Sequence, residues 1–332
     1  MLEAIATLSG HEEESRLWHA AWSNNGVYLA SSGEDKIIRI WSSSNSDWNK
    51  DDGGISCIAT LEDGRSRTLR SCEWSPNDRM IASASFDGTV VIWEAQSSSM
   101  TVWDQIATLE GHDSEVKSVA WSPDGRWLAS CGRDKRVWIW EMLGGSEFEC
   151  VSMLEGHTQD VKFVRWHPTS SSILVSASYD DTLKVWTEDN DDWYCAETLQ
   201  GHTSTVWGLT FAPGGTKIIS CSDDNSILKW ECDGLEGKGT WRISAKLSDV
   251  HQFPIYSIDC SPSNCYIATG GGDNCITLCS TNSDSLLQVV SRVSEAHTGD
   301  VNCVRWNPND KFGYLLASTG DDGLVKLWRL IL

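Results

Sequence analysis

The sequence repeats three side chains that together can make a catalytic nucleophile: a hydroxyl, a histidine and an aspartate. In a serine hydrolase the histidine removes the hydroxyl proton, and the aspartate orients the histidine. Each aspartate here stands six residues before a strand-ending residue that is usually tryptophan, and a hydroxyl residue stands four positions before the aspartate. The aspartates are Asp35, Asp87, Asp134, Asp180, Asp224, Asp273 and Asp322, the hydroxyl residues are Ser31, Ser83, Ser130, Ser176, Ser220, Thr269 and Ser318, and the upstream histidines are His11, His112, His157, His202, His251 and His297.

Repetition favours a structural role for these sets over catalysis. The seven strand-ending residues follow one another at intervals of 44 to 52 positions, which is typical of solenoids and propellers. In such a unit the aspartate can accept hydrogen bonds from turn N–H groups and from the histidine, which can link to the hydroxyl and to the tryptophan indole. Each charge-assisted link stabilises by roughly 1.5–3 kcal/mol. Two units depart from the pattern, because Arg65 stands where the second should have histidine and Cys279 replaces the sixth tryptophan.

Within one unit the apolar pattern predicts four short strands and no helix. In the third unit the strands are VKSVAWS, LASCG, VWIWE and FECVSML, separated by the turn signals PDG, RD and GGS. Seven such units resemble the WD40 β-propeller, so the expected fold is all-β, with seven blades in a single domain, 1–332. Residues 2–8 match the fourth-strand pattern that the last unit lacks, so we expect them to close the ring in the last blade. The expected blades are 9–60, 61–108, 109–153, 154–198, 199–246, 247–292, and 293–332 plus 2–8.

Composition argues against several classes of function. A formal net charge of −21 disfavours nucleic acid, because cations that neutralise phosphates lead that binding. The sequence has no run of 18 apolar residues and no basic, apolar leader, so we expect no membrane span and an intracellular protein. The twelve cysteines include no C-x-x-C pair, which predicts buried thiols, no metal site and no cofactor. The closest grouping is Cys260, Cys265, Cys275 and Cys279.

Variable positions inside the repeated frame predict where partners bind. One is the residue before each network aspartate, and the other lies four residues before the residue that ends each inner strand. Both are expected on one face of a propeller, the top face. The first set is Glu34, Phe86, Arg133, Tyr179, Asp223, Gly272 and Asp321, and the second is Trp18, Arg70, Lys117, Lys162, Trp207, Tyr256 and Asn302.

Four cations gather in this set although the chain is acidic. They are Arg70, Lys117, Arg133 and Lys162, flanked by Phe86, Tyr179, Trp18, Trp207 and Tyr256. A cationic centre with an aromatic border suits an anionic peptide, especially one that ends in an aromatic residue and a carboxylate. Arginine offers a planar donor fork for a carboxylate, and aromatic side chains are typical binding hot spots. The alternative is that Arg133 only pairs with neighbouring acids such as Glu115 or Asp160.

Longer stretches resemble one family of WD40 proteins. GRDKRVWIWE, EGHTQDVKFVRWHP, SASYDDTLKVWTEDNDDWYCAETLQGHTSTVWGL and HTGDVNCVRWNP are similar to the WD40 protein of the cytosolic iron–sulfur protein assembly machinery, the Ciao family, and the resemblance covers all seven units. It implies a non-catalytic scaffold that hands assembled clusters to apoproteins and holds none itself, with Arg133 as a functional surface residue. The partners it implies are a small acidic adaptor, a HEAT-repeat adaptor, an iron-only-hydrogenase-like cluster carrier and client apoproteins. The chain would be a monomer within that hetero-complex, in the cytoplasm and also the nucleus.

Two other hypotheses remain open. One is a WD40 reader of acidic or phosphorylated peptides, such as a ligase substrate receptor, although no F-box-like segment is visible. The other is an enzyme or metal carrier, which would require stoichiometric metal. Separately, the polar stretch SSSNSDWNKDDGG at 42–54 predicts a flexible loop that tolerates insertions.

Overall fold

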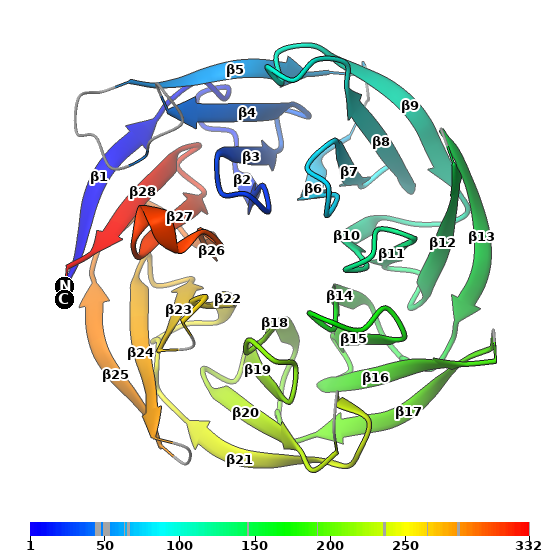
Figure 1. Cartoon of the computed structure of the whole chain (residues 1–332). Coiled ribbons are helices and arrows are strands. Elements are labelled where there is room, and N and C mark those ends of the chain that lie inside the picture. The colour runs from blue at the N-terminus through cyan, green and yellow to red at the C-terminus, as the bar shows by residue number, and fades with distance from the viewer. Residues whose placement is uncertain are drawn as a thin grey trace.

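The chain folds into seven four-stranded sheets that follow one another around a ring (Figure 1). The computed structural model describes residues 1–43, 48, 54–62, 64, 67–144, 146–190, 192–234, 237–263, 265–283 and 286–331. Each sheet is one blade, and every strand pairs antiparallel with its neighbour in the blade, so the predicted seven-bladed propeller is confirmed. In the described part of the chain, no helix is long and apolar enough to cross a membrane.

The first four blades each contain four consecutive strands. Blade 1 consists of β2 (Leu17–Trp22), β3 (Tyr28–Gly33), β4 (Ile38–Ser43) and β5 (Ile55–Leu61). Blade 2 consists of β6 (Leu69–Trp74), β7 (Met80–Ser85), β8 (Thr89–Ala95) and β9 (Trp103–Glu110). Blade 3 consists of β10 (Val116–Trp121), β11 (Trp127–Gly132), β12 (Val137–Gly144) and β13 (Glu147–Leu154). Blade 4 consists of β14 (Val161–Trp166), β15 (Ile173–Ser178), β16 (Thr182–Asp189) and β17 (Asp192–Gln200).

The last blade combines strands from both ends of the chain. Blade 5 consists of β18 (Val206–Phe211), β19 (Lys217–Ser222), β20 (Ile227–Cys232) and β21 (Trp241–Leu247). Blade 6 consists of β22 (Ile255–Cys260), β23 (Tyr266–Gly271), β24 (Ile276–Ser283) and β25 (Leu286–Val293). Blade 7 consists of β26 (Val301–Trp306), β27 (Leu315–Gly320), β28 (Val325–Leu330) and β1 (Leu2–Leu8), and a 3₁₀ turn, η3 (Asp310–Phe312), precedes β27.

Burial explains why the strand patterns differ across a blade. The second strand is buried along its whole length in blades such as 2 and 4, where β7 reads MIASAS and β15 reads ILVSAS. Neighbouring blades cover both of its faces, so small and apolar residues run continuously. The outermost strand is partly exposed, as in β9 and β17, and there polar residues interrupt the apolar ones. The core therefore lies between blades, in clusters such as the one that joins Leu183 of blade 4 to Leu228 of blade 5.

The N-terminal strand closes the ring, as the sequence predicts. β1 pairs antiparallel with β28, from Leu2 opposite Leu330 to Leu8 opposite Val325. The closure extends one residue further, because the amide of Ile331 donates to the carbonyl of Met1 over 2.9 Å. Leu2 and Leu8 are buried in the contact. Pairing removes two free strand edges, which would otherwise invite aggregation.

Trp48 corrects the prediction that 42–54 is a free polar loop. Most of the residues from 44 to 53 lie outside the described residues, but Trp48 is buried and stacks edge-on against Trp22 with 5.0 Å between ring centroids. Its indole Nε1 donates to the carbonyl of Gly26 over 3.0 Å, and its own carbonyl accepts from Arg329 Nη2 over 2.8 Å. Trp48 thus connects blades 1 and 7, although the residues around it in the sequence are polar. We therefore expect insertions beside Trp48 to destabilise the chain.

The first strands of the blades surround the central channel (Figure 1). β2, β6, β10, β14, β18, β22 and β26 contact one another in a closed circle. Each carries a one-residue register shift near its start, as in β10, where the shift lies between Val116 and Ser118. A β-bulge re-aims the side chain at the inserted position. In blade 3 that position is Lys117, so the bulge places the second variable set at the channel mouth.

Candidate docking surface at the channel mouth

The repeated polar set forms a buried hydrogen-bond chain. In blade 4, His157 Nδ1 lies 2.8 Å from Asp180 Oδ2, His157 Nε2 lies 2.7 Å from Ser176 Oγ, and the Trp186 indole donates to that hydroxyl over 2.8 Å. The distances from Nδ1 to the carboxylate are 2.7 to 3.0 Å in the six blades with the histidine, and those from Nε2 to the hydroxyl are 2.6 to 2.9 Å. Ser176 is fully buried, so a substrate cannot reach its oxygen.

Each network aspartate also braces its turn. The residue after it adopts a left-handed backbone in every blade, for example Lys135 with φ 68° and Gly323 with φ 71°. The aspartate Oδ1 accepts the amide two residues ahead, as from Arg136 to Asp134 over 3.2 Å, which is the hydrogen bond of an Asx-turn. The aspartate thus fixes both the turn and the histidine.

Protonation states follow from this arrangement. Burial would raise the pKa of the Asp180 carboxyl, but hydrogen bonds from His157 and Thr182 outweigh it and hold the pKa below its ordinary value. Burial also lowers the pKa of His157, although Asp180 opposes the shift. The pair is therefore an ionised carboxylate that accepts from a neutral imidazole. In the other blades with a histidine, the hydrogen bond from the histidine likewise outweighs burial and lowers the pKa of the aspartate. This holds for Asp35, Asp134, Asp224 and Asp322, and for Asp273, where the pKa is about 2.

Blades 2 and 6 show what the sequence departures change. In blade 2 the Ser83 hydroxyl donates to the carbonyl of Val91, and the Trp93 indole is buried with no hydrogen-bond partner among the described residues. Arg65 lies outside the described residues. In blade 6 Cys279 is buried where the tryptophan would stand, and Asp273 receives an additional hydrogen bond from Arg292.

The turn and the bulge bring the two variable sets together. In blade 3 the amide of Arg133 donates to the carbonyl of Glu115 over 2.9 Å, and Lys117 follows two residues later. The same bond recurs in every blade, for example from Tyr179 to Asp160. We call the first set (Glu34, Phe86, Arg133, Tyr179, Asp223, Gly272 and Asp321) the rim, and the second (Trp18, Arg70, Lys117, Lys162, Trp207, Tyr256 and Asn302) the mouth.

These residues line two adjoining hollows. A rim hollow of about 290 Å³ is lined by Phe86, Glu115, Lys117, Arg133, Gln159, Asp160 and Tyr179. All seven mouth residues line a smaller one of about 20 Å³ at the channel entrance, and Lys117 belongs to both. The four cations thus lie on one face, as the sequence predicts. Asn302 is only 6% exposed, and its amide donates to Leu17 and Asp321 inside the chain.

The cations of blades 3 and 4 are partly paired. Arg133 Nη1 lies 3.2 Å from Glu115, the pairing considered as the alternative from sequence, yet its side chain is 60% exposed. Lys117 Nζ lies 2.7 Å from Asp160, and Lys162 Nζ lies 3.7 Å from the same carboxylate. Burial would raise the pKa of Asp160, but the Lys117 hydrogen bond and nearby cations lower it. The two lysines therefore share one counter-charge, while most of the Arg133 side chain is exposed at the surface.

Aromatic rings hold the two deeper cations. The Arg70 guanidinium lies 4.9 Å from the centroid of the Trp18 ring. Lys162 Nζ lies 5.0 Å from the ring of Tyr179 and 4.8 Å from that of Trp207. Burial, followed by the charge of Lys117, lowers the pKa of Lys162 to about 8. Cation–π contacts of this kind are strengthened by desolvation.

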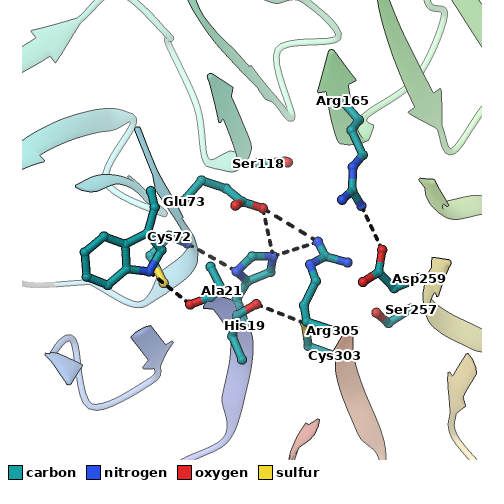
Figure 2. A network of polar contacts seen from close by, with 12 residues as sticks. His19, Ala21, Cys72, Glu73, Ser118, Arg165, Ser257, Asp259, Cys303 and Arg305 are labelled. Atoms are coloured by element: carbon teal, nitrogen blue, oxygen red, sulfur yellow. Dashed lines mark hydrogen bonds and ion pairs between the residues drawn. The ribbon is translucent and has the colours of Figure 1, made fainter. Parts of the chain in front are cut away.

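A second charged cluster lies among the inner strands (Figure 2), and two of its residues, His19 and Arg305, also line the hollow at the mouth. Arg305 Nη2 lies 3.1 Å from His19 Nε2 and 3.7 Å from Glu73 Oε1, and Arg165 Nη1 lies 3.3 Å from Asp259 Oδ1. Burial, reinforced by Arg305, lowers the pKa of His19 far below its ordinary value, and burial raises the pKa of Glu73. Sequence reasoning missed this cluster. The signal for Glu73, Arg165, Asp259 and Arg305 was a charge directly before the residue that ends an inner strand, whereas His19 lacked it.

The cysteines form no candidate metal site. Among the described residues, no group of three or more His, Cys, Asp or Glu side chains could hold a metal ion. None of the twelve cysteines, all within the described part of the chain, forms a disulfide. Burial raises the pKa of Cys260 and of Cys279 to about 12, which keeps both protonated.

The chain matches a repeat family and several full-length proteins. The family model described as "WD domain, G-beta repeat" matches residues 2–42, 55–94, 103–141, 148–187, 193–231, 244–280 and 288–329. A Chlamydomonas reinhardtii protein named "Probable cytosolic iron-sulfur protein assembly protein CIAO1 homolog" is 45% identical, covering 99% of this chain and 98% of the relative. "Protein CIA1" of Arabidopsis thaliana is 42% identical over 99% of this chain and 96% of its own length. The chain belongs to the CIAO1 family of WD40 proteins.

Membership in the CIAO1 family extends over nearly the whole chain. A further relative, the "Probable cytosolic iron-sulfur protein assembly protein CIAO1 homolog" of Schistosoma japonicum, is 38% identical and covers 95% of both chains. The sequence resemblance to this family is therefore confirmed. WD40 propellers of this family are generally non-catalytic, which agrees with the burial of the repeated serine and histidine side chains.

Proposed function

We propose that this chain is a non-catalytic scaffold in cytosolic iron–sulfur protein assembly, which docks assembly partners and client apoproteins through the rim hollow. Membership in the CIAO1 family supports the pathway. The observation that carries the docking role is the rim hollow, where exposed Arg133 stands between Phe86 and Tyr179. Such a hollow suits a carboxylate next to an aromatic or apolar side chain, because arginine and aromatic residues dominate binding energy at interfaces.

The proposed partners are protein chains. They are a small acidic adaptor, a HEAT-repeat adaptor, an iron-only-hydrogenase-like cluster carrier and client apoproteins, which this chain would meet as a monomer in the cytoplasm and nucleus. The cluster is cargo carried by these partners. A reader of phosphorylated peptides is less well supported, because Glu115 and Asp160 lie inside the hollow and repel a phosphate dianion more strongly than a singly charged carboxylate.

Charge reversal at Arg133 tests the docking role. Because the Arg133 side chain is 60% exposed and bonded only to Glu115 within the described residues, Arg133→Glu should leave the thermal unfolding midpoint nearly unchanged. It should abolish copurification of the assembly partners from cells, measured by quantitative mass spectrometry. Arg126→Glu is the matched control, because that side chain is 55% exposed and pairs with Glu141 outside either hollow. Equal recovery of partners with both variants would contradict the proposal.

A further inference from the structure

The top face carries opposite charge on its two sides. Blades 2 to 4 contribute four cations at the rim and mouth, Arg70, Lys117, Arg133 and Lys162, against the two carboxylates Glu115 and Asp160. Blades 5 to 7 contribute Asp223, Asp300 and Asp321, and no cation at either set of positions. The top face is therefore positively charged on one side of the channel and negatively charged on the other.

The three carboxylates lie on one side of the channel entrance. Asp223 accepts from the indole of Trp207, whose ring meets that of Tyr256, and the amide of Asp321 donates to the carbonyl of Asp300 over 3.0 Å. The pKa of Tyr256 is raised to about 12, first by burial and then by the charges of Asp300, Asp223 and Asp321. All three carboxylates are therefore close enough to act on one phenol. Burial and the neighbouring Asp321 also raise the pKa of Asp300. The repulsion among these groups would be relieved by an incoming cation.

The acids on this side are only weakly compensated. Asp223 accepts from the Trp207 indole over 3.4 Å and from the Ser204 hydroxyl over 3.2 Å. Neither Asp223 nor Asp300 forms an ion pair within the part of the chain that the structure describes. Asp321 has one, with Arg16 at 3.6 Å, and the Arg16 side chain is 53% exposed.

An aromatic pair connects the two sides. The Trp207 ring lies 4.8 Å from Lys162 Nζ and meets Tyr256 edge-on at 5.2 Å between centroids. The channel-entrance hollow between them holds only about 20 Å³, close to the space of a single water. A docked segment must therefore lie across the mouth, over the aromatic pair, instead of entering the channel.

We propose that the mouth binds a bipolar protein segment in one direction, with its carboxylates on the Arg133 side and a lysine or arginine on the Asp223 and Asp300 side. This inference rests on the proposed docking function and adds a second, cation-binding contact to it. Charge complementarity supports this occupant, since a wholly acidic segment would meet three carboxylates on crossing the channel. The polarity gives the surface selectivity and a direction, which is the main effect of charges at an interface rim.

Labelled synthetic peptides test the direction. The probes are ten-residue peptides with a free carboxyl terminus, an aromatic last residue, an aspartate before it, and a single lysine, alanine or glutamate four to seven residues upstream. Fluorescence anisotropy at low ionic strength gives the dissociation constants. For the wild-type chain, the best-placed lysine peptide should bind about fivefold more tightly than its alanine counterpart, as expected for one exposed ion pair.

Variants of the protein assign the contact. Asp223→Asn should remove the advantage of lysine over alanine, and Asp223→Lys should reverse the preference to glutamate, with unfolding midpoints checked for both. One outcome separates the two proposals. If Arg133→Glu weakens the binding of every peptide, and the lysine, alanine and glutamate peptides bind the wild-type chain equally at all spacings, then the bipolar contact is wrong and the docking role stands. If Arg133→Glu changes no affinity, the docking function fails, and this inference fails with it.

Discussion

Arg165 and Asp259 form an ion pair across the channel, with 3.3 Å between Nη1 and Oδ1, although their strands belong to blades 4 and 6 (Figure 2). Asp259 also accepts from the Thr210 hydroxyl of blade 5 over 3.1 Å and from the amide of Trp306 in blade 7 over 2.9 Å. One carboxylate thus joins four successive blades. The cluster of His19, Glu73 and Arg305 similarly joins blades 1, 2 and 7.

This arrangement makes Asp259 more important for stability than its partner Arg165. Asp259→Ala leaves donors from three blades without their acceptor, two of them buried, and should lower the free energy of unfolding by about 3 kcal/mol. Arg165→Met removes one partly exposed donor and should cost about 1 kcal/mol. Urea unfolding followed by tryptophan fluorescence measures both changes. Equal losses in the two variants would mean that Asp259 does not bridge the blades.

Blade 4 tests the value of the histidine. Asp180 accepts from the amide and the hydroxyl of Thr182, and His157 Nδ1 lies 2.8 Å from its carboxylate. We expect Asp180→Ala to destabilise the chain by about 2–3 kcal/mol, and Thr182→Ala, which removes only the hydroxyl, by about 1 kcal/mol. Calorimetric unfolding of both variants gives the difference, and a larger loss at Thr182 would contradict the network.

Acid should destabilise the fold in two stages. The pKa of His11, His157 and His297 is lowered in the folded chain by burial, so the unfolded chain binds their protons first. Their contribution is complete above the unfolded histidine pKa of about 6.5 and is lost as the pH falls below it. The network aspartates, whose pKa is also lowered, lose theirs below about pH 4. Unfolding midpoints should decline in both acid ranges as the pH falls from 7; a maximum near pH 5 would refute this.

Docking should have its own pH dependence. The pKa of Lys162 is lowered to about 8, by burial and by Lys117, so its charge is lost as the pH rises through this value. Affinity for an acidic aromatic peptide should therefore fall between pH 7 and 9, measured by fluorescence anisotropy. Lys162→Arg retains the charge and should flatten the profile. The same decline in both proteins would show that Lys162 is not the titrating group.

Removal of β1 should affect the whole ring. Deletion of residues 2–8 exposes the edge of β28 and removes the buried side chains of Leu2 and Leu8. We expect loss of soluble monomer on size-exclusion chromatography, because a free strand edge promotes association. Thr7→Ala, at an exposed position of the same strand, should elute as the unmodified chain does. A monomeric, cooperatively unfolding deletion variant would contradict the closure.

Much of this molecule is determined locally by the sequence. The spacing from Asp134 to Trp140, repeated around the chain, is enough to predict the blades and the braced turns, because each depends on a turn and on neighbouring strands. The strand 2–8 is predicted from its match to the fourth-strand pattern that the last unit lacks, although its partner β28 lies at the other end of the chain. It also places Arg133 and Lys117 on the same face, since a turn and a bulge two or three positions away set where a side chain lies. The rim and mouth positions could therefore be predicted from the sequence.

Contacts across the ring were decided only by the tertiary structure. Asp160 serves both Lys117 and Lys162, Arg165 reaches Asp259, and Trp48 fills the space between blades 1 and 7. Apart from Asp160 and Lys162, the partners lie on different blades, and the separations between their side chains depend on the angle between blades and on ring closure. No local pattern encodes those separations, because seven blades must pack together before a charge in one strand can meet its partner in another.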